Sequence, residues 1–254
     1  MVCFKGPHIN HLTPRTLDID AAQSQMGERG LTAKAVIEGP PPRQVPILLR
    51  QTSFTALKEP VTFREADGKP VVGGHKARFG EIEQRGVALT PAGRALYDRL
   101  LAESRAEAKA TCDGRNDESY LAALSRKFEA FPDSEEGLRR AGLAYFRYSA
   151  AGAQAPAASE DLETEIARGT VTAEPITYED FLPVSAAGIF RSNLGGDRRE
   201  DFAENANQAA FEAALGAAVL DAFTLYARAE TDSKIATQTT LSLVGSFGRV
   251  FVGT

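Results

Sequence analysis

Apolar and polar residues alternate over much of the first third of the chain, with the period of two that is typical of strands buried on one face. Strands with this alternation, or with a compact apolar run, are predicted at 9–13, 31–38, 45–49, 54–63 and 76–84. One helix interrupts them, with Asp18 or Asp20 as its N-cap and Gly30 at its end. The Asp-Gly pair at 67–68 and the Gly-Gly pair at 73–74 predict turns. Most of the sheet is therefore expected in this part of the chain.

The pattern changes to helical spacing after Thr90. Thr90-Pro91 predicts a helix start, because threonine is a good N-cap and proline suits the first helical position. Helices are predicted at 90–109, at 119–130, from 133 or 134 onward, at 205–215 and at 219–230. The Ala/Gly/Pro-rich segment 149–159 is predicted to be a loop, and the tail 239–254 an edge strand or a disordered end. Alternating elements followed by helices predict an α+β architecture.

Composition narrows the class of protein. The 254 residues are 43% hydrophobic, which is enough for a substantial core, and the net charge of −5 gives no electrostatic footprint for nucleic acid or an anionic membrane. No apolar run reaches the roughly 18 residues of a membrane helix, and residues 1–14 have no signal-peptide pattern. The two cysteines, Cys3 and Cys112, make no disulfide framework. We expect a soluble, cytoplasmic protein with reduced thiols.

Three histidines are candidates for a metal site. His8 and His11 lie three residues apart, so in a strand they face opposite sides and one of them can be a ligand. His75 is a poor candidate because it follows the predicted Gly-Gly turn. The alternative for each is an ordinary structural or exposed histidine.

Two carboxylates share one face of a predicted strand. Glu81 and Glu83 are two residues apart, and Arg78 and Arg85 flank them. Buried carboxylates need a partner or a metal, whereas a solvent-facing strand edge with salt bridges is the simpler alternative. One histidine and one carboxylate would supply two of the three ligands of the facial triad that suits Fe(II) and dioxygen chemistry.

The segment 184–188, Val-Ser-Ala-Ala-Gly, follows a proline. Its small residues allow backbone N–H groups to approach a ligand closely, so it can hold a carboxylate. A tight packing corner explains the same composition equally well. The polar residues 50–53, at the end of an apolar strand, suit the lining of a pocket.

Several blocks closely resemble the 2-oxoadipate dioxygenase/decarboxylase family, also called 2-hydroxyglutarate synthase, over roughly residues 2–230 and in its C-terminal portion only. The blocks that carry the resemblance are 8–20, 37–41, 46–54, 77–96 and 175–190. The resemblance implies a vicinal-oxygen-chelate-like mixed sheet with a helix-rich C-terminal part. It also implies a non-haem Fe(II) enzyme that converts 2-oxoadipate and O2 to D-2-hydroxyglutarate and CO2 in bacterial lysine breakdown.

The resemblance also implies roles for individual residues. His11 is similar to one iron ligand and Glu83 to the carboxylate ligand, with Glu81 as the alternative, while Val184 and Ser185 resemble the segment that binds the substrate carboxylate. We expect 1–90 to form the metal-site β/α half-barrel portion, 91–235 to complete the substrate pocket, and 236–254 to be an unmatched tail.

The resemblance has one clear departure. Family members carry an N-terminal half with a His-x-x-x-Arg motif that supplies the other histidine ligand and a substrate arginine. His11 and Arg15 have this spacing, but Arg15 belongs to a different family block, so the motif of the N-terminal half does not occur here. We therefore expect the active enzyme to need a missing N-terminal half or a second polypeptide. The alternatives are an inactive metal- or 2-oxo-acid-binding fragment, or a structural module that pairs with a partner.

Overall fold

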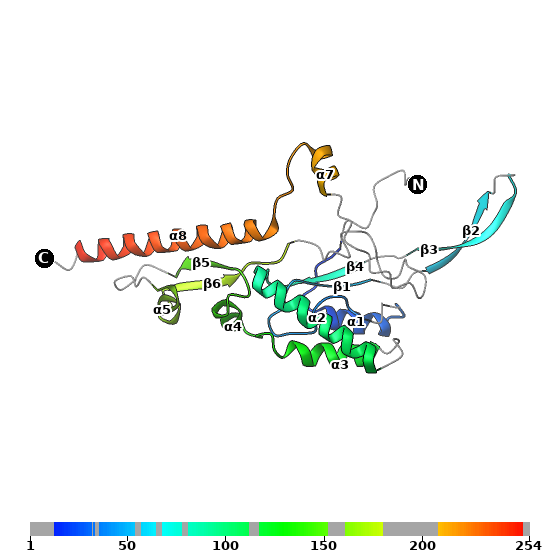
Figure 1. Ribbon diagram of the computed structural model, residues 1–254, viewed down its shortest axis with the longest axis horizontal. Coiled ribbons are helices and arrows are strands. Elements are labelled where there is room, and N and C mark those ends of the chain that lie inside the picture. Colours follow the sequence, from blue (N-terminus) through cyan, green and yellow to red (C-terminus); the bar gives the residue numbers. More distant parts are fainter. Residues whose placement is uncertain are drawn as a thin grey trace. The chain divides into compact units, whose positions relative to one another are not determined.

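The computed structural model describes residues 13–31, 33, 36–53, 57–64, 68–77, 81–111, 117–151, 161–179 and 208–250. The chain divides into two compact units, of which the first comprises 1–86 and 98–131 and the second 87–97 and 132–254. Helices mix with three two-stranded antiparallel sheets in the described ranges, as Figure 1 shows. The predicted α+β class is confirmed at this level. The three-part division at 90 and 235 stays a prediction about what the segments do.

The first unit contains two of these sheets. Its elements are α1 (Ile19–Glu28), β1 (Leu49–Ser53), β2 (Leu57–Arg64), β3 (Pro70–Ala77), β4 (Glu81–Arg85), the later part of α2 (Pro91–Thr111), and α3 (Asp117–Phe128). Strand β1 pairs with β4, and β2 with β3. Single bridges widen the β1–β4 sheet on both sides, because Arg15 pairs with Glu83 and Glu38 pairs with Gln51.

Helix α1 forms where the sequence predicts it and covers one face of the β1–β4 sheet. Asp18 is the N-cap, and its Oδ1 accepts a hydrogen bond from the N–H of Ala21 at 2.9 Å. Ile19 is fully buried and packs with Ile37 and Ile82. This face of the sheet is therefore committed to the core of the first unit, and the opposite face carries the other side chains of β4.

Three predictions in the first unit are wrong. The described residues of 31–38 form no regular strand, only isolated bridges. The apolar run at 45–49 is buried from Ile47 onward but enters a strand only at Leu49, because Leu48 has φ of 54° and interrupts extended backbone. Gly73 and Gly74 lie inside β3 instead of in a turn, and Gly68, at φ of 81°, lies between β2 and β3.

The second unit contains the third sheet and the longest helix. Its elements are the start of α2, α4 (Glu135–Arg140), β5 (Phe146–Ala150), α5 (Leu162–Ala167), β6 (Val171–Pro175), α7 (Gln208–Leu215) and α8 (Ala222–Val250). The predicted helix starts hold, because Thr90 Oγ1 accepts a hydrogen bond from Gly93 N and Ser134 Oγ from Gly137 N. The β5–β6 pair was not predicted.

Helix α8 corrects the prediction for the tail. Residues 239–250 continue α8 instead of forming an edge strand. The helix lies along β5, and its side chains meet the strand's outer edge: Glu230 Oε1 accepts from Phe146 N at 3.0 Å and Ser233 Oγ accepts from Tyr148 N at 3.1 Å (Figure 1). A helix that satisfies the N–H groups of a strand edge protects that edge from pairing with other chains.

Two tyrosines at this junction give the stability a dependence on alkaline pH. Burial and the nearby negative charge of Glu230 raise the pKa of Tyr145 and Tyr148 above 10.0. A raised pKa favours the neutral phenol in the folded state, so the stabilisation is complete below pH 10 and is lost as the pH rises through the folded-state pKa.

Glu230→Gln should lessen this alkaline loss, because the amide still accepts the hydrogen bond from Phe146 but carries no charge. The measurement is urea unfolding at about pH 8 and about pH 11, near the ends of the tyrosine titration. Glu174→Gln, at an exposed position of β6, is the matched control. Equal alkaline losses in wild type, Glu230→Gln and Glu174→Gln would contradict the prediction.

Candidate functional site on the polar face of the β1–β4 sheet

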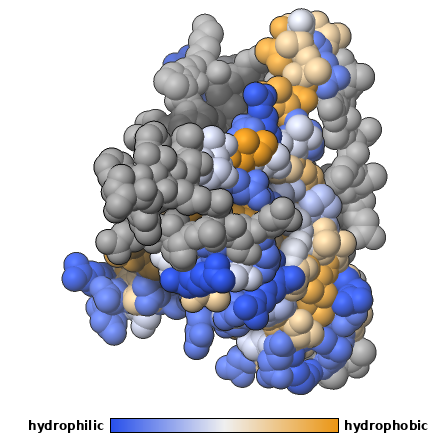
Figure 2. Space-filling view, turned by 90° about the vertical axis from the view of Figure 1, so that its left-hand side faces the viewer, coloured by the Kyte–Doolittle hydropathy of each residue, from blue (hydrophilic) through white to orange (hydrophobic). Residues whose placement is uncertain are grey.

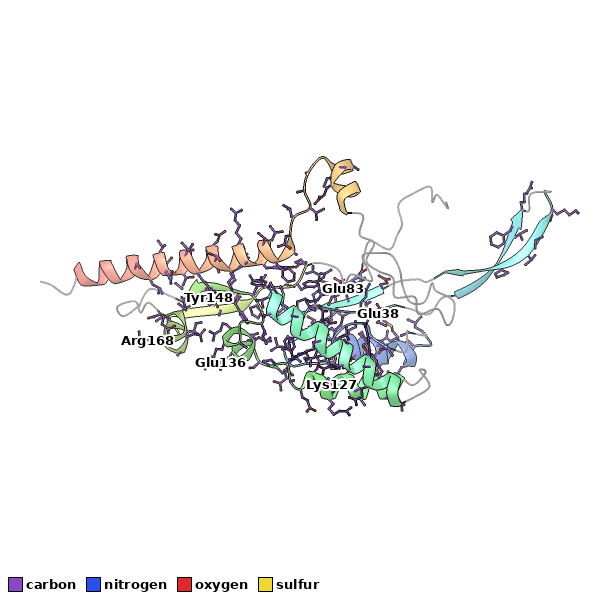
Figure 3. The ribbon with its side chains drawn as sticks, viewed as in Figure 1. Glu38, Glu83, Lys127, Glu136, Tyr148 and Arg168 are labelled. Atoms are coloured by element: carbon purple, nitrogen blue, oxygen red, sulfur yellow. The ribbon has the colours of Figure 1, made fainter. Side chains whose placement is uncertain are left out.

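Four polar residues form a row across one face of the widened sheet. Gln51 is the register partner of Glu83 in the β1–β4 ladder, Arg15 pairs with Glu83 from the other side, and Glu38 pairs with Gln51. Residues directly opposite each other in neighbouring strands project from the same face. Figure 3 labels Glu38 and Glu83 at this sheet. The face opposite α1 is therefore lined with charged side chains and one amide side chain, all of which can form hydrogen bonds.

Backbone hydrogen bonds fix the segment 14–16 against β4. The N–H of Glu83 donates to Pro14 O at 3.0 Å, and the N–H of Thr16 donates to Glu83 O at 2.7 Å. The hydroxyl of Thr16 donates to the same carbonyl at 3.2 Å. The position of Glu83 is thus set from both sides, by β1 and by this segment.

Glu83 is a buried carboxylate held by guanidinium groups. The residue is only 4% exposed. Arg85 Nε donates to Glu83 Oε1 at 2.7 Å and Arg85 Nη2 donates to Oε2 at 3.3 Å, while Arg15 Nε lies 3.6 Å from Oε1. A fork of this kind offsets a buried negative charge and fixes the plane of the carboxylate. Glu83 is therefore not the solvent-facing group that the simpler alternative expects.

Glu81 shares the strand and the face with Glu83 but has different surroundings. It is only partly buried, and its Oε2 accepts a hydrogen bond from Gln51 Nε2 at 2.7 Å. The predicted placement of both carboxylates on one face of a strand is confirmed. Gln51 is buried and lies opposite Glu83 in the ladder, and its hydrogen bond to Glu81 connects the two positions.

Most of the other residues singled out from the sequence lie outside the described residues. These are His8, His11, Arg78, Val184 and Ser185. His75 is in β3, as the register partner of Glu59, and not in a turn. Sequence reasoning did not place Arg15 or Glu38 at this face, and it named Gln51 only as part of a polar segment suited to a pocket lining. Only the cross-strand register brings these residues beside Glu83.

The chemistry of Glu83 fits one position of a metal site. A carboxylate has about four lone-pair positions, so a guanidinium fork leaves room for a further partner. Within the described ranges, no group of three or more His, Cys, Asp and Glu side chains is arranged to hold a metal ion. A facial triad at this face would therefore need ligands from outside those ranges.

Comparison with known proteins identifies the family of the chain. The 2-oxoadipate dioxygenase/decarboxylase family matches residues 1–193. The chain belongs to this family.

Two relatives and one solved structure give the extent of the similarity. A 2-oxoadipate dioxygenase/decarboxylase of Pseudomonas putida is 53% identical over 96% of this chain and 53% of its own length. One from Escherichia coli K12 is 55% identical over 92% of this chain and 51% of its own. The crystal structure of the Pseudomonas putida hydroxyglutarate synthase in complex with 2-oxoadipate matches with a TM-score of 0.77 and 52% identity, over 94% of this chain and 52% of that one.

The chain thus spans about half the length of the curated relatives it matches. Among its described helices, none is both long enough and apolar enough to cross a membrane.

Proposed function

We propose that this chain carries the carboxylate-ligand part of an Fe(II)-dependent enzyme that converts 2-oxoadipate and O2 to D-2-hydroxyglutarate and CO2. The family and the relative's complex with 2-oxoadipate support the substrate class. The observation that carries the proposal in this chain is Glu83, a buried carboxylate on the polar face of a sheet. A buried carboxylate needs a charged partner or a metal, and this need supports a site at Glu83.

His11 and Glu83 are the proposed metal ligands, with Glu81 as the alternative carboxylate. His11 lies four residues before Arg15, which is the bridge partner of Glu83. His11 is proposed in preference to His8 because it is the histidine similar to the family's iron ligand. Glu83 is favoured over Glu81 because it is the more deeply buried of the two and is in direct register with the segment that follows His11.

The residues of the chain have separate tasks in this proposal. Fe(II), when bound, supplies the redox chemistry that lets O2 react with a 2-oxo acid. Glu83 supplies an anionic oxygen to the metal, and Arg15 and Arg85 offset its charge and hold its orientation. Val184 and Ser185 bind a substrate carboxylate through backbone N–H groups and the hydroxyl, which suits a dicarboxylic 2-oxo acid.

A role in lysine breakdown, a cytoplasmic location and a vicinal-oxygen-chelate-like arrangement of the sheet belong to the same proposal. Because the chain covers about half of its relatives, the complete site is proposed to include the N-terminal half of such an enzyme or a second polypeptide. Exposed apolar side chains on the described surface are consistent with such a partner. Hydrophobic patches lie between hydrophilic ones on the face drawn in Figure 2.

A second candidate function is a metal- or 2-oxo-acid-binding fragment without activity. The observation that favours it is the absence, among the described residues, of a group of three metal-binding side chains. Each missing ligand removes coordination energy, so this fragment would bind iron weakly.

Anaerobic titration of the purified chain with Fe(II), followed by O2 uptake with 2-oxoadipate, separates the two. Stoichiometric binding with uptake that depends on 2-oxoadipate, and release of CO2 and 2-hydroxyglutarate, supports the enzyme. Adipate, which lacks the keto group that chelates a metal, is the matched substrate control. Weak binding and no uptake support the fragment, and restoration of uptake by an added N-terminal half of a relative would identify what is missing.

A further inference from the structure

We infer that Arg85 is the positioning residue for Glu83, holding its carboxylate in the plane and direction in which it meets a metal. The inference rests on the proposed function and deepens it. It concerns a residue that acts through the proposed ligand Glu83.

The geometry of the pair sets it apart from an ordinary surface ion pair. Arg85 donates from two nitrogens to the two oxygens of Glu83, at 2.7 Å and 3.3 Å. Both side chains are buried, with 7% of Arg85 and 5% of Glu83 exposed. Two parallel hydrogen bonds fix the rotation of the carboxylate, which a single point charge does not.

The guanidinium is placed on a rigid base. Arg85 is the last residue of β4 and the register partner of the fully buried Leu49, and the next residue, Gly86, donates its N–H to Leu48 O at 2.8 Å. Arg85 and Glu83 are two residues apart, so they project from the same face of the strand. The fork is therefore held by the sheet and not by a loop.

Arg15 does not have the same role. Its Nε lies 3.6 Å from Glu83 Oε1, beyond a good hydrogen bond, and 56% of its side chain is exposed. It contributes charge near the carboxylate, whereas Arg85 contributes orientation. Hydrogen bonds to ligating carboxylates commonly set metal affinity in this way.

The test is Co(II) binding to the full chain and to Arg85→Lys, Arg85→Gln and Arg147→Gln, followed anaerobically by the visible spectrum of the ion. Lysine keeps the charge and loses the fork, and glutamine loses both. Arg147, an exposed arginine on β5, is the matched control. Circular dichroism establishes that each variant is folded.

We expect Arg85→Gln to bind Co(II) about 10- to 100-fold more weakly, the usual effect of losing such a supporting group. Arg85→Lys should fall between wild type and Arg85→Gln and show an altered spectrum, because the ligand field reports the direction of the carboxylate. Arg147→Gln should stay within roughly twofold of wild type, as exposed substitutions do.

The inference is overturned if folded Arg85 variants bind Co(II) with an affinity within roughly twofold of wild type and give an unchanged spectrum. A difference of about twofold is typical of neutral surface substitutions. If Arg85→Gln does not fold, Arg85→Lys decides by the same criterion. A folded wild-type chain that binds no Co(II), either alone or with the N-terminal half of a relative added, overturns the proposed metal site and this inference with it. Co(II) binding by the wild type therefore tests the proposed metal site, and the difference between the wild type and the Arg85 variants tests the role of Arg85.

Discussion

Glu83→Gln is expected to lower the Fe(II) affinity of the chain by about 100-fold, whereas Glu81→Gln is expected to change it by less than threefold. The binding free energy of structural zinc sites with four ligands reaches about 10–16 kcal/mol, which is roughly 3 kcal/mol for each ligand. Loss of one ligand therefore corresponds to the expected loss of affinity of about 100-fold. The smaller change for Glu81→Gln follows because Glu81 is only partly buried and is already a hydrogen-bond acceptor for Gln51. The measurement is anaerobic titration of the two variants and the wild type.

These two substitutions are matched, because both replace a glutamate by its amide on the same face of β4. Stability distinguishes loss of a ligand from loss of the fold. Removing the charge of Glu83 leaves buried Arg85 without its full partner, and breaking a buried pair costs about 3–5 kcal/mol at worst. Urea unfolding therefore accompanies each titration. A larger loss of affinity in folded Glu81→Gln than in folded Glu83→Gln would assign the ligand to Glu81.

Gly86→Ala is expected to destabilise the chain by about 3 kcal/mol, the upper end of the usual cost of overpacking. A Cβ at this position would lie 2.2 Å from the carbonyl oxygen of Pro46 and 2.4 Å from the nitrogen of Ile47. Both are backbone atoms, so no side chain can rotate away. Urea unfolding of wild type and variant measures the difference.

The control for this substitution is expected to change the free energy of unfolding in the opposite direction. Gly27 lies in α1, and a Cβ there would meet no atom within 4 Å. Gly27→Ala should therefore stabilise by about 0.5–1 kcal/mol, the difference in helix propensity between the two residues. If Gly86→Ala causes no more destabilisation than Gly27→Ala, the close approach of Gly86 to the Pro46–Ile47 segment is wrong.

The helices were more predictable than the strands, for a physical reason. Caps such as Asp18, Thr90 and Ser134 bond N–H groups within the first turn of the helix, so a short stretch of sequence is enough to predict them. Strand limits depend on partners far along the chain. The apolar run before Leu49 has the composition of a strand, but Leu48 turns the backbone away, and nothing local in the sequence indicates this.

The candidate site was predictable only in part. Parity along one strand was enough to place Glu81 and Glu83 on one face, because that argument needs a single segment. The row of Arg15, Glu83 and Gln51 needs the register of three segments, and spacing within one segment carries no such information. Arg85 was noted as a flanking charge, but its fork onto Glu83 depends on the burial of both side chains.

The contact between α8 and β5 has a consequence for anyone who shortens this protein. Glu230 and Ser233 accept the hydrogen bonds that the outer edge of β5 would otherwise offer to a neighbouring strand. A version ending before α8 would present those two N–H groups, from Phe146 and Tyr148, to other molecules in solution. Unprotected strand edges recruit one another, so such a truncation would convert a folding unit into a template for intermolecular sheets.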